Sequence, residues 1–256
     1  MNAALPPIRG AGFLSLLSVP RVAASFRRPP DSATVAKLRG EGLEIAEIRL
    51  DLAESETAET PPDIAKIEKA GREIVSAVSA LPSALTIRPL WEGGNFSGGE
   101  EMRRDLFLRF LPQVSAADIE LAAEIRPQII AAAKECGAAV IVSRHKIDGV
   151  DSPEVLDAAA ERAFAEGADV FKYAGVVGNE NDFVALRTFL QKWKTRPVIV
   201  VGMGLSEFAR RSRRSFPAQG SRIAFAAVDG LPSAPGQLNL SETVAAVRSR
   251  DFGVSE

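Results

Sequence analysis

Short apolar runs separated by helical stretches are the feature of this sequence that most limits its fold. We interpret each run as a buried strand, because continuous apolar runs bounded by turn residues are typical of parallel sheets. Eight such runs recur along the 256 residues: Leu14 to Val19, Ile45 to Leu50, Ala84 to Ile87, Ala117 to Leu121, Ala138 to Ser143, Asp169 to Tyr173, Pro197 to Val201 and Arg222 to Ala227.

Helical periodicity fills most of the gaps between these runs. The clearest helix follows the fifth run, where Ser152 is suited to cap it, Pro153 to occupy its first position and Gly167 to end it. Further helices are expected over about residues 180–192 and 241–248. The stretch 51–82 gives no clear pattern.

Eight strands alternating with helices over about 250 residues predict one α/β domain, a (β/α)8 TIM barrel spanning residues 1–256. Residues 1–11 and 251–256 are expected to be loose termini. An open doubly wound sheet is the alternative. Against it, the first run is followed by no Gly-x-Gly-x-x-Gly turn, and the sequence contains no Walker-type phosphate loop.

Composition limits the partners and the compartment. The 31 basic and 33 acidic residues give a net charge of -2, which gives no reason to expect nucleic acid or a membrane surface as a partner.

The lone Cys136 permits no internal disulfide and fits a reducing cytoplasm. The run from Gly12 to Pro20 resembles a signal peptide only weakly, because it is short and interrupted by serines. One histidine and one cysteine make a zinc site unexpected, whereas a carboxylate magnesium site stays open.

Charged residues fall where the predicted strands end, which is where (β/α)8 enzymes place their reacting groups. The second run carries Glu47, Arg49 and Asp51 at alternate positions, so they share one side of the strand. Buried charges need mutual pairing or a ligand. On the fourth run, Asp118 and Glu120 are expected to pair with arginines inside the barrel.

His145 and Lys172 give the strongest chemical signal. His145 is the only histidine of the chain and follows the fifth run, while Lys172 lies toward the end of the sixth. The unperturbed pKa of a histidine lies near neutrality, and a lysine in an apolar setting is suited to forming an imine. Structural roles remain open for both residues. A strand-end lysine, in particular, usually extends its amino group to solvent.

These residues resemble the type I 3-dehydroquinate dehydratases, the Schiff-base enzymes of the shikimate pathway. The resemblance rests on EIRLD, the arginine and glutamate of TIRPLWEGG, the serine and histidine of IVSRHK, GADVFKYA, and SAPGQL with GSRIAFA upstream. It covers most of the chain, and the motifs follow in the family's order. It implies a cytoplasmic homodimer that dehydrates 3-dehydroquinate, a small anionic substrate, to 3-dehydroshikimate with no metal or organic cofactor.

The resemblance also implies roles for individual residues. Lys172 would form the imine, His145 would transfer protons, and Glu92 would be the carboxylate partner of His145. Arg213 would bind the substrate carboxylate, with Arg211 as the alternative if the spacing is counted forward from the seventh strand. The other residues implied for the site are Glu47, Arg49, Arg88, Phe225, Ser233 and Gln237, the last two on a loop expected to act as a lid.

Departures from the family pattern keep two alternatives open. Lys146 and Ile147 follow His145 where the family commonly has an acidic residue and an aromatic one, and the added positive charge of Lys146 predicts a lowered pKa for His145. Trp91 stands where the family often has a basic residue and is expected to alter the entrance. One alternative is a catalytically silent ligand-binding paralogue. The other is an imine-forming barrel aldolase, which would share Lys172.

Overall fold

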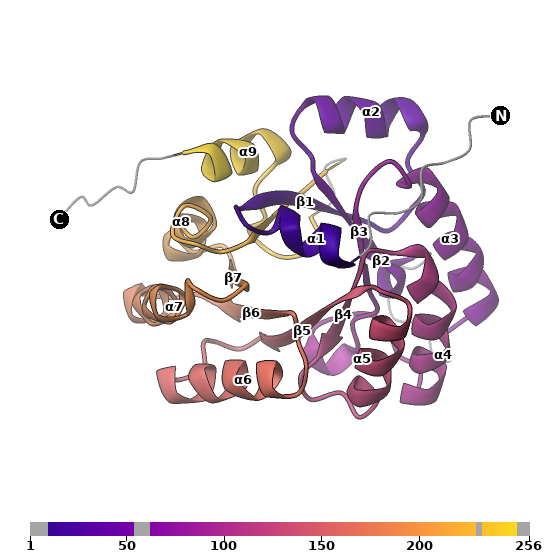
Figure 1. Ribbon diagram of the computed structural model, residues 1–256. Helices are drawn as coiled ribbons and strands as arrows, with labels where there is room; N and C mark the ends of the chain where they lie inside the picture. Colours follow the sequence, from indigo (N-terminus) through magenta and orange to yellow (C-terminus); the bar gives the residue numbers. More distant parts are fainter. Residues whose placement is uncertain (1–9, 54–61, 229–231, 250–256) are drawn as a thin grey trace.

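The computed structural model describes residues 10–53, 62–228 and 232–249, and its eight strands form one parallel sheet wrapped into a nearly closed barrel (Figure 1). The strands pair in the order β7-β6-β5-β4-β3-β2-β1-β8. They are β1 (Arg21–Phe26), β2 (Ile45–Arg49), β3 (Ser83–Thr86), β4 (Ala116–Glu120), β5 (Ala139–Lys146), β6 (Val170–Val176), β7 (Val198–Met203) and β8 (Ile223–Ala226). The predicted (β/α)8 barrel is therefore confirmed, and the open sheet is excluded.

Helices α2 to α9 surround the sheet on its outer side, whereas α1 lies over one end of the barrel (Figure 1). The helices are α1 (Gly10–Leu16), α2 (Ser32–Gly40), α3 (Ile64–Ala77), α4 (Glu100–Phe110), α5 (Arg126–Glu135), α6 (Pro153–Ala165), α7 (Glu180–Trp193), α8 (Glu207–Ser215) and α9 (Leu240–Arg248), with short 3-10 turns at Leu50–Leu52, Leu90–Glu92 and Leu111–Gln113. The predicted helices correspond to α6, α7 and α9, and α3 lies in the stretch that gave no pattern.

The predicted first strand, Leu14 to Val19, is wrong. Its residues belong to the end of α1 and the turn that follows, and β1 begins only at Arg21. The other seven predicted strands each overlap an observed one. The expected loose termini lie mostly outside the described residues, while residues 10 and 11 are the first two residues of α1.

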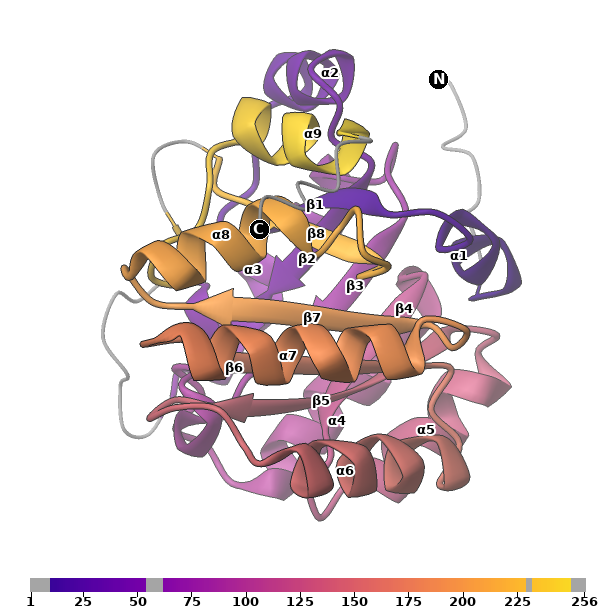
Figure 2. The same ribbon diagram turned by 90° about the vertical axis from the view of Figure 1, so that its left-hand side faces the viewer.

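Helix α1 covers the N-terminal end of the barrel, opposite to the end toward which β7 points (Figure 2). Phe13 of the helix and Leu17, in the turn directly after it, point to the same side and are almost fully buried. They share a core cluster with the first inward-facing residues of the strands, from Ala23 to Ile223. The backbone N–H of Gly10 donates to the Gly137 carbonyl at 2.8 Å, which fixes the start of the helix.

The inside of the barrel is apolar near α1 and charged toward the C-terminal ends of the strands. Along β2, Ile45 belongs to the apolar cluster, and the next inward positions are Glu47 and Arg49. Ile48, between them, packs on the outer side of the sheet. The alternation predicted from EIRLD is therefore confirmed for Glu47 and Arg49, whereas Asp51 lies beyond the end of β2, in the 3-10 turn Leu50–Leu52.

A buried chain of ion pairs supports this charged half. Arg88 donates to Asp118 at 2.7 Å and to Glu120 at 2.5 Å. Arg103 reaches Glu120 from α4, also at 2.5 Å, and its side chain is fully buried. Pairing of Asp118 and Glu120 with arginines is thus confirmed, although the sequence gave no indication of Arg103.

Arg103→Met is expected to destabilise the fold by about 3–5 kcal/mol, because it leaves the Glu120 carboxylate buried with one partner fewer. Arg104→Met is the control, since Arg104 lies on the same helix and, among the described residues, pairs with the exposed Asp105. Its expected effect is within about 0.5 kcal/mol. Urea unfolding of both variants measures the difference, and equal losses would contradict a structural role for the buried pair.

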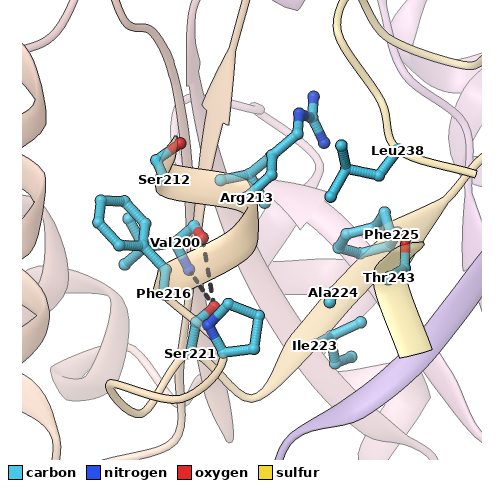
Figure 3. A pocket seen from close by; sticks show the side chains of 12 residues that line it. Val200, Ser212, Arg213, Phe216, Ser221, Ile223, Ala224, Phe225, Leu238 and Thr243 are labelled. Atoms are coloured by element: carbon cyan, nitrogen blue, oxygen red, sulfur yellow. Dashed lines mark hydrogen bonds between the residues drawn. The ribbon is translucent and has the colours of Figure 1, made fainter. Parts of the chain in front are cut away.

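The barrel closes between β7 and β8 partly through a side chain. The Arg222 N–H donates to the Val198 carbonyl at 2.9 Å. The Ser221 hydroxyl accepts from the Val200 N–H at 2.9 Å and donates to the Val200 carbonyl at 3.2 Å (Figure 3). Ser221 therefore takes the place of a backbone partner at this seam.

Candidate active site

A cavity of about 330 Å³ lies at the C-terminal end of the barrel. Parallel strands deliver their inward-facing ends to this point, so residues distant in sequence meet here. The ten side chains predicted for the site all line it: Glu47, Arg49, Arg88, Glu92, His145, Lys172, Arg213, Phe225, Ser233 and Gln237. Met203 and Ile147 line it as well.

Lys172 is buried in the wall of this cavity, with 5% of its surface exposed. Its Nζ lies 2.8 Å from Oδ2 of Asp118 and 3.6 Å from Oε1 of Glu47. The ring of Phe225 covers the same nitrogen, with its centroid at 4.6 Å. The amino group therefore faces the cavity instead of extending to solvent.

His145 and Glu92 form a close pair on the side of β5 that faces the cavity. Nδ1 of His145 lies 2.7 Å from Oε2 of Glu92, and the backbone N–H of His145 donates to the same oxygen at 3.1 Å. Because Oε2 already accepts the backbone proton, a protonated Nδ1 complements it best. This arrangement leaves Nε2 as the ring nitrogen available for proton transfer.

Burial shapes the charge of this pair. It raises the pKa of Glu92 to about 8, against the opposing effect of Arg88. Burial, followed by the positive charges of Arg88 and Lys172, holds the pKa of His145 well below its usual value. His145 is therefore neutral near pH 7 and suited to act as a base.

The predicted lowering of the His145 pKa is present, but Lys146 is not placed to be its main cause. The ammonium of Lys146 pairs with Asp148 at 2.6 Å. Successive residues of a strand point to opposite faces, so the side chain of Lys146 leaves β5 away from that of His145. Trp91 is half exposed, as is Ile147 on the cavity rim.

The structure distinguishes the two candidate arginines by their surroundings. Arg213 is 9% exposed and lines the cavity, and burial lowers its pKa to about 10. Its guanidinium donates to the Pro235 carbonyl at 3.2 Å, and its Nε has no hydrogen-bond partner among the described residues. Arg211 lies on the exposed side of α8 and pairs with Glu180 at 3.3 Å.

Arg213 also borders a second, smaller cavity of about 20 Å³ between β7 and β8 (Figure 3). Phe216, Ile223 and Leu238 make most of its lining apolar. Arg213 thus lines both cavities, as do Val201 and Phe225. The guanidinium of Arg213 is one of the groups that can donate hydrogen bonds to an anion in the main cavity.

The SAPGQL loop packs against the mouth of the cavity. The Ser233 N–H donates to Oε1 of Gln237 at 2.7 Å, and the Gly204 N–H donates to the Pro235 carbonyl at 3.2 Å. Gly236 has a φ of +73°, and a Cβ there would lie 1.9 Å from the Gly204 carbonyl oxygen, so only glycine fits. Closing and opening of this loop remains a prediction.

Several polar residues of the site were missed in the sequence. Thr86 donates to Oε1 of Glu47 at 3.1 Å, and Ser25 donates to Oε2. Ser25 also lies 3.0 Å from the hydroxyl of Ser233 and so joins β1 to the loop. The error in the first strand hid Ser25, and the signal that would have found it is its alternate position with Ala23 in RVAASF.

The described part of the chain contains neither a metal-binding cluster nor a helix that could span a membrane. No cluster of three or more His, Cys, Asp or Glu side chains within them could hold a metal ion. No helix of the described part of the chain is long and apolar enough to cross a membrane.

Comparison with known proteins gives a consistent result. The family model described as type I 3-dehydroquinase matches residues 29–251. A 3-dehydroquinate dehydratase of Methanosarcina acetivorans is 32% identical over 227 residues, which cover 86% of this chain and 90% of that protein. One from Methanothrix thermoacetophila is 33% identical over 234 residues, covering 91% and 92%.

Solved structures match the same fold. The 3-dehydroquinate dehydratase of Geobacillus kaustophilus superposes with a TM-score of 0.77 at 24% identity, covering 89% of this chain and 90% of that one. The type I enzyme of Clostridium difficile gives 0.74 at 24% identity, with 90% and 91% covered. The family model and the sequence relatives both span most of the chain, and the chain belongs to the type I 3-dehydroquinase family.

Proposed function

We propose that this chain converts 3-dehydroquinate to 3-dehydroshikimate through an imine on Lys172. The observation that carries the proposal is the meeting, in one cavity of a chain of this family, of a buried lysine amino group and a neutral histidine paired with a carboxyl group. The relatives named above are 3-dehydroquinate dehydratases, which supports this substrate.

Substrate binding is assigned to the polar residues around the lysine. The guanidinium of Arg213 binds the substrate carboxylate, because planar guanidinium and carboxylate groups form two parallel hydrogen bonds. Ser233 and Gln237 bind hydroxyl groups from the loop above the cavity. Arg49, which Asp51 holds at 2.7 Å, adds positive charge at the cavity wall.

Imine formation begins when the neutral amino group of Lys172 attacks the ketone carbon. The C–N bond forms as the carbonyl π bond breaks, and the oxygen takes up a proton. Loss of this oxygen as water leaves a protonated C=N bond, with His145 carrying protons in both steps. The positively charged imine makes the hydrogens on the adjacent carbon acidic.

Elimination then follows in two proton transfers. Nε2 of His145 removes a proton from the carbon next to the imine, and the electron pair moves to form an enamine. The β-hydroxyl leaves as water after receiving a proton from the same ring, and the pair returns to restore the imine. Hydrolysis releases the product and Lys172. Glu92 holds the ring in position through its contact with Nδ1.

Turnover with 3-dehydroquinate tests the proposal directly. The expected result is growth of the ultraviolet absorption of the conjugated product. Borohydride added during turnover is expected to trap a reduced adduct on the Lys172 peptide. A folded chain with neither turnover nor adduct contradicts the proposal. Binding of 3-dehydroquinate without turnover would identify the silent paralogue, and turnover of sugar phosphates alone would identify the aldolase.

The assignment of Arg213 predicts a specific loss of substrate affinity. Arg213→Ala is expected to raise the KM for 3-dehydroquinate by roughly 100-fold, because a buried charged partner of the carboxylate is lost. Arg211→Ala removes the same side chain from an exposed pair and is expected to change KM by less than about two-fold. Steady-state kinetics measures both, and a larger effect at Arg211 would reverse the assignment.

The proposal extends to the setting of the enzyme. We assign it as a homodimeric single domain of the cytoplasm, supported by the family resemblance and by the single cysteine. The net charge of -2 supports a small anionic substrate as partner in place of nucleic acid. Light scattering of the purified chain tests the dimer.

A further inference from the structure

We propose that Asp118 is the counter-ion of the Lys172 nitrogen and that it keeps the imine protonated during the reaction. The inference rests on the imine mechanism proposed above and goes beyond it. It gives a chemical role to a residue that the sequence indicated only as an arginine partner.

The contact between the two groups is short and shielded from water. Oδ2 of Asp118 lies 2.8 Å from Nζ of Lys172, and the two side chains are 2% and 7% exposed. Glu47 is the second carboxylate near this nitrogen, at 3.6 Å. Both oxygens of Glu47 accept hydroxyl protons, from Thr86 and Ser25. Asp118 therefore provides the closer negative charge to Nζ.

The carboxylate of Asp118 is fixed in both position and charge. Its Oδ1 accepts from Arg88 at 2.7 Å and from the Ser143 hydroxyl at 2.6 Å, which leaves Oδ2 for the lysine nitrogen. Burial alone would raise the pKa of Asp118, but Arg88 and Lys172 outweigh it and hold this pKa below its usual range. Asp118 is thus ionised at working pH and is a poor proton acceptor, so we assign it as a counter-charge and not as the base.

A counter-charge at this position matters because the imine accepts electrons only while its nitrogen carries a proton. When His145 removes the carbon-bound proton, the nitrogen becomes neutral in the enamine. It regains its positive charge when the hydroxyl leaves as water. The N–H bond persists through both steps and points at Oδ2. Without the carboxylate, the imine loses its proton at a lower pH and stops accepting electrons.

Other charged groups surround the pair and must stay constant in the test. A substitution at Asp118 alone changes one charge and leaves these groups in place. They are Glu47 on β2, Arg88 after β3, Glu92 in the turn that follows, Glu120 on β4 and His145 on β5.

The test compares Asp118→Asn with Glu120→Gln. Both substitutions remove a buried carboxylate from Arg88, but Glu120 bonds Arg103 where Asp118 bonds Lys172. The kcat for 3-dehydroquinate is measured from about pH 5 to pH 10. In Asp118→Asn the alkaline limb is expected to move down by about 1–3 pH units, the effect of one neighbouring charge. In Glu120→Gln the alkaline limb is expected to stay at the same pH as in the wild type.

The proposal that Asp118 is the counter-ion is overturned if the alkaline limb of kcat does not move in Asp118→Asn, or if it moves equally in both variants. A wild-type chain that shows no turnover contradicts the proposed function instead, so the two failures are distinguishable.

A second measurement does not depend on the folding of Asp118→Asn. In His145→Ala labelled with nitrogen-15 lysine, the imine accumulates and its nitrogen shift reports protonation. We expect it to stay protonated at least one pH unit above the imine of 3-dehydroquinate with butylamine in water. Loss of the proton at the same pH as the free imine overturns the proposal.

Discussion

Lys172→Ala is expected to lower kcat for 3-dehydroquinate by about 10⁴-fold or more, because it removes the nucleophile on which every later step depends. The fold should survive, since Asp118 keeps its bonds to Arg88 and Ser143. Lys146→Ala is the matched control. It removes a lysine that pairs with Asp148 near the same cavity, and its kcat is expected to stay within about two-fold of the wild type.

Single-turnover kinetics and borohydride trapping measure this prediction together. The wild type and Lys146→Ala should yield the reduced adduct, and Lys172→Ala should yield none. Near-ultraviolet circular dichroism verifies the fold of each variant. A folded Lys172→Ala chain that retained more than about one hundredth of wild-type kcat would contradict imine catalysis at this residue.

His145→Ala is expected to lower kcat by about 10²–10⁴-fold, the usual contribution of a positioned acid–base group. Lys172 is intact in this variant, so the imine should still form. Borohydride should then trap mainly the adduct of the undehydrated substrate, which is heavier by one water than that of the product. Normal turnover in this variant would make His145 a structural residue.

The wild-type pH profile gives an independent measure of the same role. Burial, Arg88 and Lys172 hold the pKa of His145 below 6.5. A base with a lowered pKa stays neutral as the pH falls, and it is lost only when the pH passes below that folded-state value. The acid limb of kcat/KM is therefore expected below pH 6.5, whereas a limb above this value would show that another group titrates.

Most of the barrel could be predicted because its strands are short apolar runs with turn residues on both sides. The wrongly predicted first strand shows where apolar runs alone are not enough to identify a strand. The run from Leu14 to Val19 is as apolar as a strand, and only the spacing of Phe13 and Leu17 indicates a helical face. The true first strand, RVAASF, begins with an arginine and contains two small alanines, so its apolar character is weak.

The members of the site could be predicted more fully than their interactions. Strand alternation places Glu47, His145 and Lys172 inside the barrel, and the structure brings them to one cavity. The sequence could not show that Lys146 pairs with Asp148, or that Asp118 bonds the lysine as well as an arginine. Both depend on side-chain conformations, at the end of β5 and in the turn after it for Lys146 and across neighbouring strands for Asp118, which a single sequence does not specify.

The position of α1 has a consequence for the time course of synthesis. Gly10 bonds the Gly137 carbonyl, and Phe13 belongs to the same core cluster as Ile223 of the last strand. At about 5–20 residues per second, a ribosome needs roughly 10–40 s to proceed from the first of these residues to the last. Throughout that interval the first helix is made but has no complete surface on which to dock. We therefore expect the newly made N-terminal segment to be a binding target for chaperones until the eighth strand has left the ribosome.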